Sequence, residues 1–108
     1  MTLQEAQKRA VAIRKLYAKL EERRYGRAWS TQELMLGFVG DVGDLAKLIQ
    51  GAVGVRATPD LEEKLAHELA DCLWSVLVLA DRLGIDIEQA FDASMSDLER
   101  NIRNQLDT

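Results

Sequence analysis

Hydrophobic residues recur along this 108-residue chain at spacings of three and four, which is the period of an α-helix. The first stripe spans residues 3–20 behind a capping box formed by Thr2 and Glu5, and Gly26 closes the segment. The last stripe follows Asp86, an N-cap residue, and consists of Phe91, Met95, Leu98, Ile102 and Leu106. No alternating strand pattern competes with these stripes, so we predict an all-α protein.

A second helix is predicted to begin at Ser30 and Glu33, which form another capping box. Trp29, just before the cap, occupies one position of a hydrophobic staple. The helical pattern continues to about Val53 and ends in a glycine-containing loop at residues 51–58. The sequence therefore predicts both ends of this helix.

The third helix is predicted to begin at residues 58–60, where Thr-Pro-Asp supplies a proline for the first turn, and to stop at Gly84. Within it, residues 72–80 read CLWSVLVLA and place apolar groups in nearly every direction at ~100° per residue. A helix that is apolar all round has to be buried all round. Because four helices of one short chain can scarcely surround one of their own, we predict a four-helix bundle completed by oligomerisation, as a homodimer or homotetramer.

Composition and charge narrow the class of protein further. Hydrophobic residues make up 47% of the chain and charged residues 30%, the balance of a single globular domain covering residues 1–108. The longest uncharged apolar run, residues 72–80, is far shorter than the ~20 residues of a membrane span, and the start carries no signal-peptide pattern. A single cysteine fits a reducing cytoplasm. The net charge of −4 argues against a nucleic-acid polymer as partner.

Four acidic residues fall on the inner parts of the second and third predicted helices. Asp41 and Asp44 are three apart at the edge of an apolar stripe, and Glu68 and Asp71 repeat that spacing. Carboxylates so placed would repel one another and be costly to bury, unless a divalent cation such as Mg²⁺ or Mn²⁺ joined them. The glycines among residues 37–43 would leave room for the ion and for phosphates. The alternative is that both acid pairs simply face solvent.

Two stretches of the chain resemble the MazG-like all-α nucleotide pyrophosphohydrolases. VGDVGDLAKL at residues 39–48 and HELADCLWSVLVLADRLGIDIEQAF at residues 67–91 are similar to the E-x-x-E and E-x-x-D motifs of that family. The second stretch also contains a match to the G-[IV]-D-[LI] turn that follows those motifs. A glycine before the first acid is typical of the dCTP pyrophosphatase-type branch. The resemblance thus predicts a MazG-like bundle.

The resemblance also implies a reaction and a set of ligands. Asp41, Asp44, Glu68 and Asp71 correspond to the catalytic acids that hold Mg²⁺ in the family, and Mn²⁺ could replace it. The implied reaction hydrolyses a nucleoside or deoxynucleoside triphosphate to the monophosphate and pyrophosphate, and it is typical of house-cleaning enzymes. The bound metal would neutralise the phosphates and activate water.

The chain departs from the family pattern in several respects. Both acids of the first motif are Asp instead of Glu, and Ser75 stands where the family has an aromatic residue. The family's K-M-x-x-N motif in the last helix has lost its lysine in either alignment that we considered. Arg100, Asn101 and Arg103 are the candidates to hold the phosphates in its place.

Further candidates have two interpretations each. Glu33 could orient the attacking water as a base, besides capping its helix, and Trp29 could stack on the nucleobase or serve as the staple alone. His67 lies at the surface or supports Glu68. The departures also leave open a catalytically degraded MazG-like protein that binds metal or nucleotide or acts as a scaffold. A helical dimer with solvated acids is the third interpretation.

Overall fold

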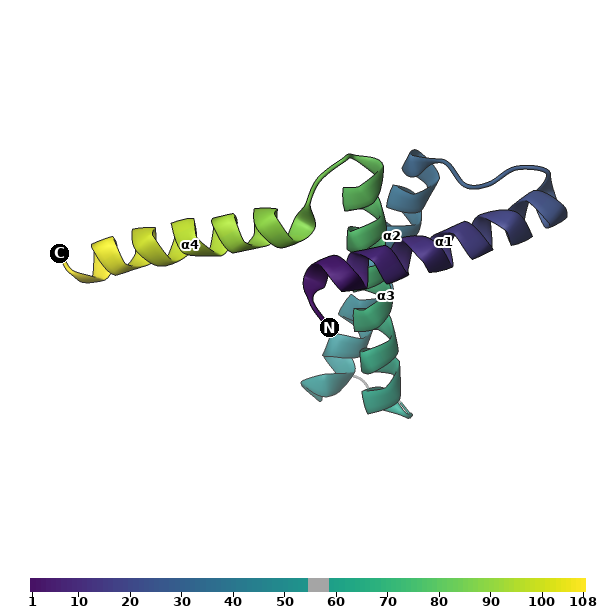
Figure 1. Ribbon diagram of the computed structural model, residues 1–108. Coiled ribbons are helices and arrows are strands. Elements are labelled where there is room, and N and C mark those ends of the chain that lie inside the picture. Colours follow the sequence, from purple (N-terminus) through teal and green to yellow (C-terminus); the bar gives the residue numbers. More distant parts are fainter. Residues whose placement is uncertain (55–58) are drawn as a thin grey trace.

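The computed structural model describes residues 1–54 and 59–108, which form four helices and no strand (Figure 1). This confirms the all-α prediction. The part of the predicted loop at residues 55–58, including Thr58, lies outside the described residues. The helices are α1 (Leu3–Tyr25), α2 (Thr31–Ala52), α3 (Leu61–Arg82) and α4 (Ile87–Leu106).

Three helices begin at the caps that the sequence predicts. The backbone N–H of Glu5 donates to the Thr2 hydroxyl at 3.0 Å ahead of α1. Ser30 heads α2 with both hydrogen bonds of a capping box in place. Asp86 accepts from the backbone N–H of Gln89 at 3.2 Å at the start of α4. Short-range sequence signals therefore fix these boundaries.

The start of α3 differs from the prediction. The helix begins at Leu61, so Pro59 precedes it instead of standing in its first turn. Asp60 adopts a left-handed conformation with φ of 53°, and its side chain makes no capping hydrogen bond within the described part of the chain. A left-handed residue turns the chain sharply into the helix, which an extended proline-led entry would not do.

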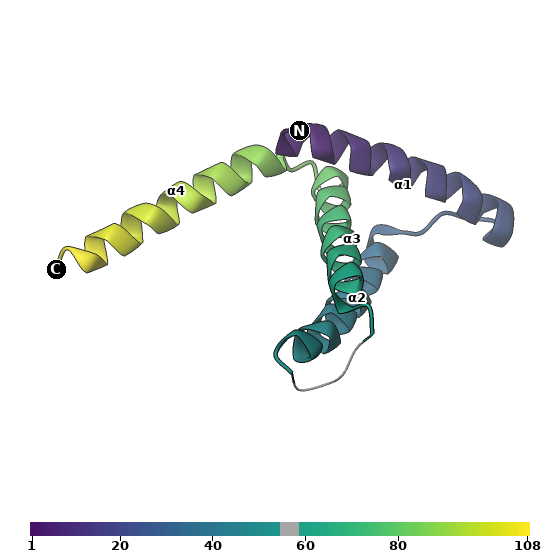
Figure 2. The same ribbon diagram turned by 90° about the horizontal axis from the view of Figure 1, so that it is seen from below.

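The four helices form a stem with two arms. Helices α2 and α3 pack side by side, and α1 crosses α3 (Figures 1 and 2). Helix α4 contacts α1 near its first turn and then extends away from the other helices. The radius of gyration is 17.4 Å, whereas a compact domain of this length has about 13 Å. One chain therefore does not close the predicted bundle by itself.

The hydrophobic core is small. Its buried apolar members are Ala10 on α1 and Leu77, Val78 and Ala80 on α3. Leu73, in the segment predicted to be buried all round, keeps 49% of its surface exposed. Within one chain, the apolar segment of the third helix is thus only partly buried, although it was predicted to be buried on all sides.

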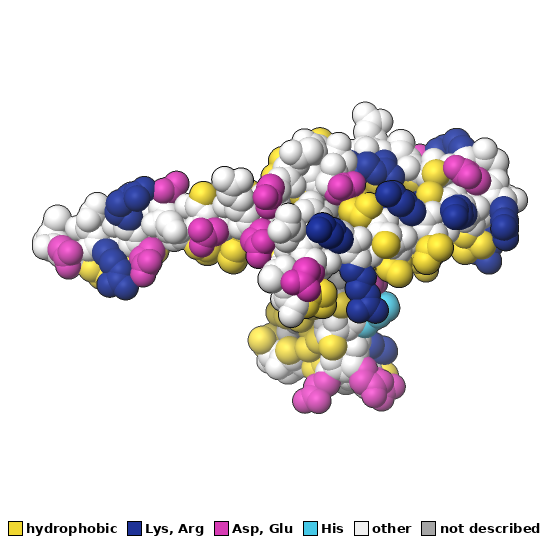
Figure 3. All heavy atoms as spheres, in the orientation of Figure 1, with side chains coloured by type: hydrophobic (Ala, Val, Ile, Leu, Met, Phe, Trp, Pro, Cys, Tyr) yellow, Lys and Arg dark blue, Asp and Glu magenta, His cyan; other side chains and the backbone are white. Residues whose placement is uncertain are grey.

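Many larger apolar side chains stay at the surface. Figure 3 shows hydrophobic side chains gathered under α1, on the stem and at intervals along α4. On α4 the exposed side chains are those of the predicted stripe: Phe91, Met95, Leu98, Ile102 and Leu106. Within residues 1–54 and 59–108, no helix is long and apolar enough to cross a bilayer.

Candidate metal centre

The packing of α2 on α3 brings the four predicted acids to one place. Carboxylate oxygens of Asp41 and Asp44 on α2 and of Glu68 on α3 lie within 4.8 Å of one another. Ligand atoms of His67, Glu68 and Asp71 meet the same limit. Glu68 belongs to both groups and so stands at the centre of the cluster.

The central carboxylate has an oxygen that needs a partner. Glu68 Oε2 is shut off from water and has no hydrogen bond from any described residue. Burial, followed by the neighbouring charges of Asp41, Asp71 and Asp44, raises the pKa of Glu68. An unsatisfied buried carboxylate oxygen is costly, and a cation would satisfy it.

The same crowding acts on the facing helix. Burial raises the pKa of Asp41, and the charges of Asp71 and Asp44 add to the effect. His67 opposes it weakly, and its Nε2 lies 3.1 Å from Asp71 Oδ2 while its side chain stays 71% exposed. His67 is therefore a surface residue that also contacts the cluster.

These residues fit a hard divalent cation. Oxygen ligands from two or more carboxylates are the set that Mg²⁺ and Mn²⁺ prefer. The cluster offers four carboxylates on two rigid helices, and its one buried orphan oxygen belongs to Glu68. The donor set thus matches the metal that the sequence resemblance implies.

A narrow cavity opens between α1 and the acid cluster. Its volume is about 120 Å³. Asp41 and Asp71 line it together with the more apolar side chains, and the full lining is Arg14, Trp29, Leu34, Gly37, Asp41, Asp71, Trp74, Ser75 and Val78. The cavity therefore joins an aromatic compartment to the candidate metal ligands.

A wider, more open hollow of about 470 Å³ lies on another side of the cluster. Asp44 and Glu68 line it, and so do Lys47 on α2 and Lys64 and His67 on α3. Two lysines beside the acids supply positive charge next to a site for anionic groups. Neither lysine stands out in the sequence, because exposed lysines on helices are common.

The glycines of α2 were predicted to leave room for an ion, but Gly37 also makes room for a neighbouring side chain. A Cβ added there would come within 3.2 Å of Trp29 Cζ3, so the missing side chain makes room for the indole ring. At Gly40 an added Cβ would meet no described atom within 4 Å. At Gly37 the indole of Trp29 thus takes up part of the room that was expected for an ion, and the same glycine also lines the narrow cavity.

Glu33 is engaged at the start of α2. Its Oε1 accepts from Arg27 Nη1 at 2.6 Å and from the backbone N–H of Ser30 at 3.0 Å. Hydrogen bonding to Arg27 is the main cause that lowers the pKa of Glu33 to about 2. A carboxylate held so strongly in its charged form is a weak proton acceptor.

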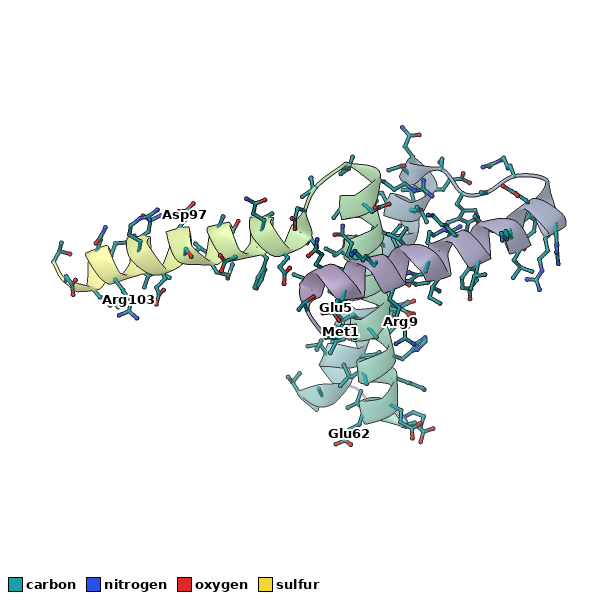
Figure 4. All side chains as sticks on the ribbon, in the orientation of Figure 1. Met1, Glu5, Arg9, Glu62, Asp97 and Arg103 are labelled. Atoms are coloured by element: carbon teal, nitrogen blue, oxygen red, sulfur yellow. The ribbon has the colours of Figure 1, made fainter. Side chains whose placement is uncertain are left out.

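The three phosphate-binding candidates lie on the α4 arm. Arg100 pairs with Asp97 at 2.5 Å, and Arg103 pairs with Glu99 at 2.9 Å. Figure 4 shows Asp97 and Arg103 on the arm, well apart from Glu62 at the start of α3. Within one chain, α4 carries Arg100, Asn101 and Arg103 away from the acid cluster.

Sequence reasoning missed one buried charged pair. Arg14 and Glu21 on α1 form an ion pair with both residues 8% exposed. Glu21 Oε1 also accepts from the backbone N–H of Trp29 at 2.9 Å. The only local signal was the spacing of seven, which puts two opposite charges on the helix face that also carries Ala10.

The fold and the acid cluster agree with a comparison of the sequence with known families. Residues 29–104 match the MazG nucleotide pyrophosphohydrolase domain, which is well over half of the chain. The chain therefore belongs to the MazG nucleotide pyrophosphohydrolase family. All four acids lie within the matched region.

Among individual proteins, the chain is similar to mouse (Mus musculus) dCTP pyrophosphatase 1. The two sequences are 36% identical over 89 residues, which is 77% of this chain. The matched part is 52% of the mouse protein, so the chain spans about half the length of this curated relative. The similarity confirms the family resemblance seen in the acid motifs.

Proposed function

We propose that this protein is a Mg²⁺-dependent nucleoside triphosphate pyrophosphohydrolase, which forms a nucleoside monophosphate and pyrophosphate. The observation that carries the proposal is the grouping of Asp41, Asp44 and Asp71 around Glu68, whose buried Oε2 has no hydrogen bond from a described residue, in a chain of the MazG family. Asp41, Asp44, Glu68 and Asp71 would hold the Mg²⁺, or Mn²⁺ in its place. When bound, the ion neutralises phosphate charge and lowers the pKa of a water molecule.

The remaining groups of the site have separate parts in this proposal. Lys47 and Lys64 line the open hollow beside the acids, where their charge favours the polyphosphate. The narrow cavity on the other side offers the rings of Trp29 and Trp74 to the nucleoside. A carboxylate oxygen of the cluster that the cation leaves free would accept the proton of the attacking water.

We also propose that the active form is a homodimer or homotetramer. The exposed apolar stripe on α4 supports this, because another copy could cover it. The large radius of gyration supports it as well, because one chain alone does not close around its helices. In such an assembly α4 of one chain would reach the stem of another. The acid cluster of that second chain would then be approached by three residues that lie far from the cluster of their own chain: Arg100, Asn101 and Arg103.

A catalytically degraded metal- or nucleotide-binding protein is the second candidate. It is favoured by the position of Arg100 and Arg103, each already paired with an acid on the α4 arm. The house-cleaning role and the cytoplasmic location stay predictions under either candidate.

A pyrophosphate-release screen tests the proposed activity directly. All nucleoside triphosphates, including dUTP and dCTP, are incubated with the protein and Mg²⁺ or Mn²⁺, and the products are separated. We expect monophosphate and pyrophosphate, and no turnover once a chelator is added. No turnover of any triphosphate, with metal binding retained, would establish the degraded binder instead.

Thermal melts of Asp71→Asn test the metal site without relying on turnover. A cation that binds only the folded wild-type chain stabilises the fold by about 2.7 kcal/mol when its free concentration is 100 times its Kd. We expect Asp71→Asn to lose this gain, yet to be as stable as the wild type or more stable without metal, since one repelling charge has gone. Asp81→Asn, an exposed acid on the same helix, is the matched control. An Asp71→Asn protein with the full metal response would refute the ligand assignment.

A further inference from the structure

Arg14 is a buried cation with hydrogen-bonding capacity to spare. Its side chain is 9% exposed, and its Nη2 donates to Glu21. Its Nε is shut off from water and finds no acceptor among residues 1–54 and 59–108. A buried donor without a partner costs about 1–3 kcal/mol, more when it is charged. The other N–H groups of the guanidinium are the ones that a ligand in the adjoining cavity would use, because Arg14 lines that cavity.

The position of Arg14 is fixed by its surroundings. The Glu21 carboxylate holds one edge of the guanidinium, and that carboxylate is itself held by the backbone N–H of Trp29. The guanidinium carbon also lies 6.0 Å from the centre of the Tyr17 ring, within range of a cation–π contact. The side chain of Arg14 is therefore held in a fixed position, and it lines the narrow cavity.

The cavity suits one six-membered aromatic ring. Its volume is about 120 Å³, and an apolar cavity of about 150 Å³ in another protein holds one benzene molecule. Trp74 forms a fixed side of it, because its Nε1 donates to the Ala10 carbonyl at 3.0 Å and its ring packs 5.6 Å from that of Tyr17. Ser75, where the family resemblance has an aromatic residue, leaves the space open.

The orientation of such a ring rests on the proposed function. If the acids hold the phosphates through a metal, the sugar lies near Asp41 and Asp71, which line the cavity. Because Arg14 on α1 lines the same cavity, we place the ring edge farthest from the sugar toward it. In a pyrimidine that edge carries the substituent at position 4, which is a keto oxygen in uracil and thymine and an amino group in cytosine.

A guanidinium only donates hydrogen bonds, so it distinguishes these two substituents. We propose that Arg14 is a specificity-determining residue that accepts 4-keto pyrimidine nucleotides, those of uracil or thymine, and disfavours 4-amino ones. The keto oxygen accepts from the guanidinium, whereas an amino group opposes one donor with another. Sites built to hydrogen-bond one substituent reject the mismatched one strongly, because a buried polar group is then left unpaired.

Competing substrates test this assignment. We expect the wild type to hydrolyse dUTP with a kcat/KM at least about tenfold above that for dCTP. Arg14→Met should bring the two values together, mainly through a loss with dUTP. Arg23→Met replaces an exposed arginine on the same helix and should keep the wild-type ratio. A wild type that treats the two alike or prefers dCTP overturns the proposal, and so does an Arg14→Met protein that loses both activities equally.

Binding measurements separate this inference from the proposed activity. Calorimetric titration with the α,β-imido analogues of dUTP and dCTP, in the presence of Mg²⁺, reports preference without hydrolysis. A uracil preference that Arg14→Met removes supports the role of Arg14 even if no triphosphate is cleaved, in which case only the proposed activity fails. Should Arg14→Met unfold, Arg14→Lys keeps the charge beside Glu21 without the planar set of donors. A lysine variant with the full uracil preference would overturn the proposal.

Discussion

The stem of α2 and α3 and the arm of α4 are built from similar helices, yet they differ in what surrounds them. In the stem, three half-buried acids and the exposed Asp44 face one another across a helix pair, and the central Glu68 has an oxygen without a partner among the described residues. On the arm, the acids Asp97 and Glu99 are each paired with an arginine on the same helix. The stem thus has clustered carboxylates without a counter-charge, whereas the arm has apolar side chains without a surface that covers them.

This difference shows that the two regions need different kinds of partner. The cation that we propose would suit the stem, because like charges are crowded around the buried Oε2 of Glu68. The arm needs apolar surface, because a lone helix of 20 residues is marginal in water and its local ion pairs are worth only ~0.3–0.5 kcal/mol each. One chain therefore brings the four acids together but leaves its hydrophobic core incomplete.

The largest contrast should come from one acid in each region. Glu68→Gln removes the carboxylate at the centre of the stem cluster, and we expect pyrophosphate release to fall at least about a hundredfold. Glu99→Gln removes an exposed, locally paired carboxylate of the arm and should leave turnover within about twofold. Steady-state kinetics at saturating Mg²⁺ measures both. Equal losses in the two variants would erase the distinction between the regions.

The next contrast concerns assembly. Leu98→Asp combined with Ile102→Asp places two charges in the apolar stripe of α4, and we expect the particle mass in solution to fall to that of one chain. Ala93→Asp combined with Asn104→Asp adds the same substituents on the opposite face of the helix and should not change the mass. Light scattering at micromolar concentration gives the answer. A wild type that is already a stable monomer would contradict the need for a second copy.

The smallest contrast is in the pH dependence of stability without metal. Asp41 and Glu68 have raised pKa values when folded, so the folded chain binds their protons more tightly than the unfolded chain does. These two groups therefore make folding more favourable as the pH falls from neutral toward their ordinary values of 3.8 and 4.5. Glu33, with a pKa of about 2, contributes stability above pH 4.5 that is lost as the pH falls through 4.5 toward 2.

Melting curves in chelator between pH 8 and pH 2.5 can separate these opposite contributions. Between pH 8 and pH 4.5, the melting temperature of Asp71→Asn should change a few degrees less than that of the wild type, because one of the charges acting on Asp41 and Glu68 is gone. Below pH 4.5, the melting temperature of Glu33→Gln should fall less than that of the wild type. A wild-type curve that Asp71→Asn leaves unchanged would show that the stem acids are already well solvated.

The sequence was sufficient for those features that depend on neighbours along the chain. The caps at Thr2, Ser30 and Asp86 could be predicted because each needs residues only three positions apart. The meeting of the two acid pairs could be predicted because each pair borders an apolar stripe, and stripes pack together. The family motifs pointed to the same four residues.

Features that depend on distant contacts could not be predicted in the same way. The stripe on α4 shows that this face should be covered, but periodicity does not say by which surface. Arg14 resembles any other charged residue of an amphipathic helix until Glu21 and Trp29 close around it. The entry to α3 was missed because an Asp in a left-handed conformation is uncommon, and no local pattern required it at Asp60.

The contact between Gly37 and Trp29 has a consequence for how this sequence can vary over generations. A Cβ at position 37 would lie 3.2 Å from the indole, which would have to shift by a few tenths of an ångström, so the two positions are coupled. Among descendants, a larger residue at 37 should be found with a smaller one at 29, as a correlated pair of substitutions. Because Trp29 lines the narrow cavity, each such exchange would also reshape it, and ligand preference could diverge while the four acids stayed the same.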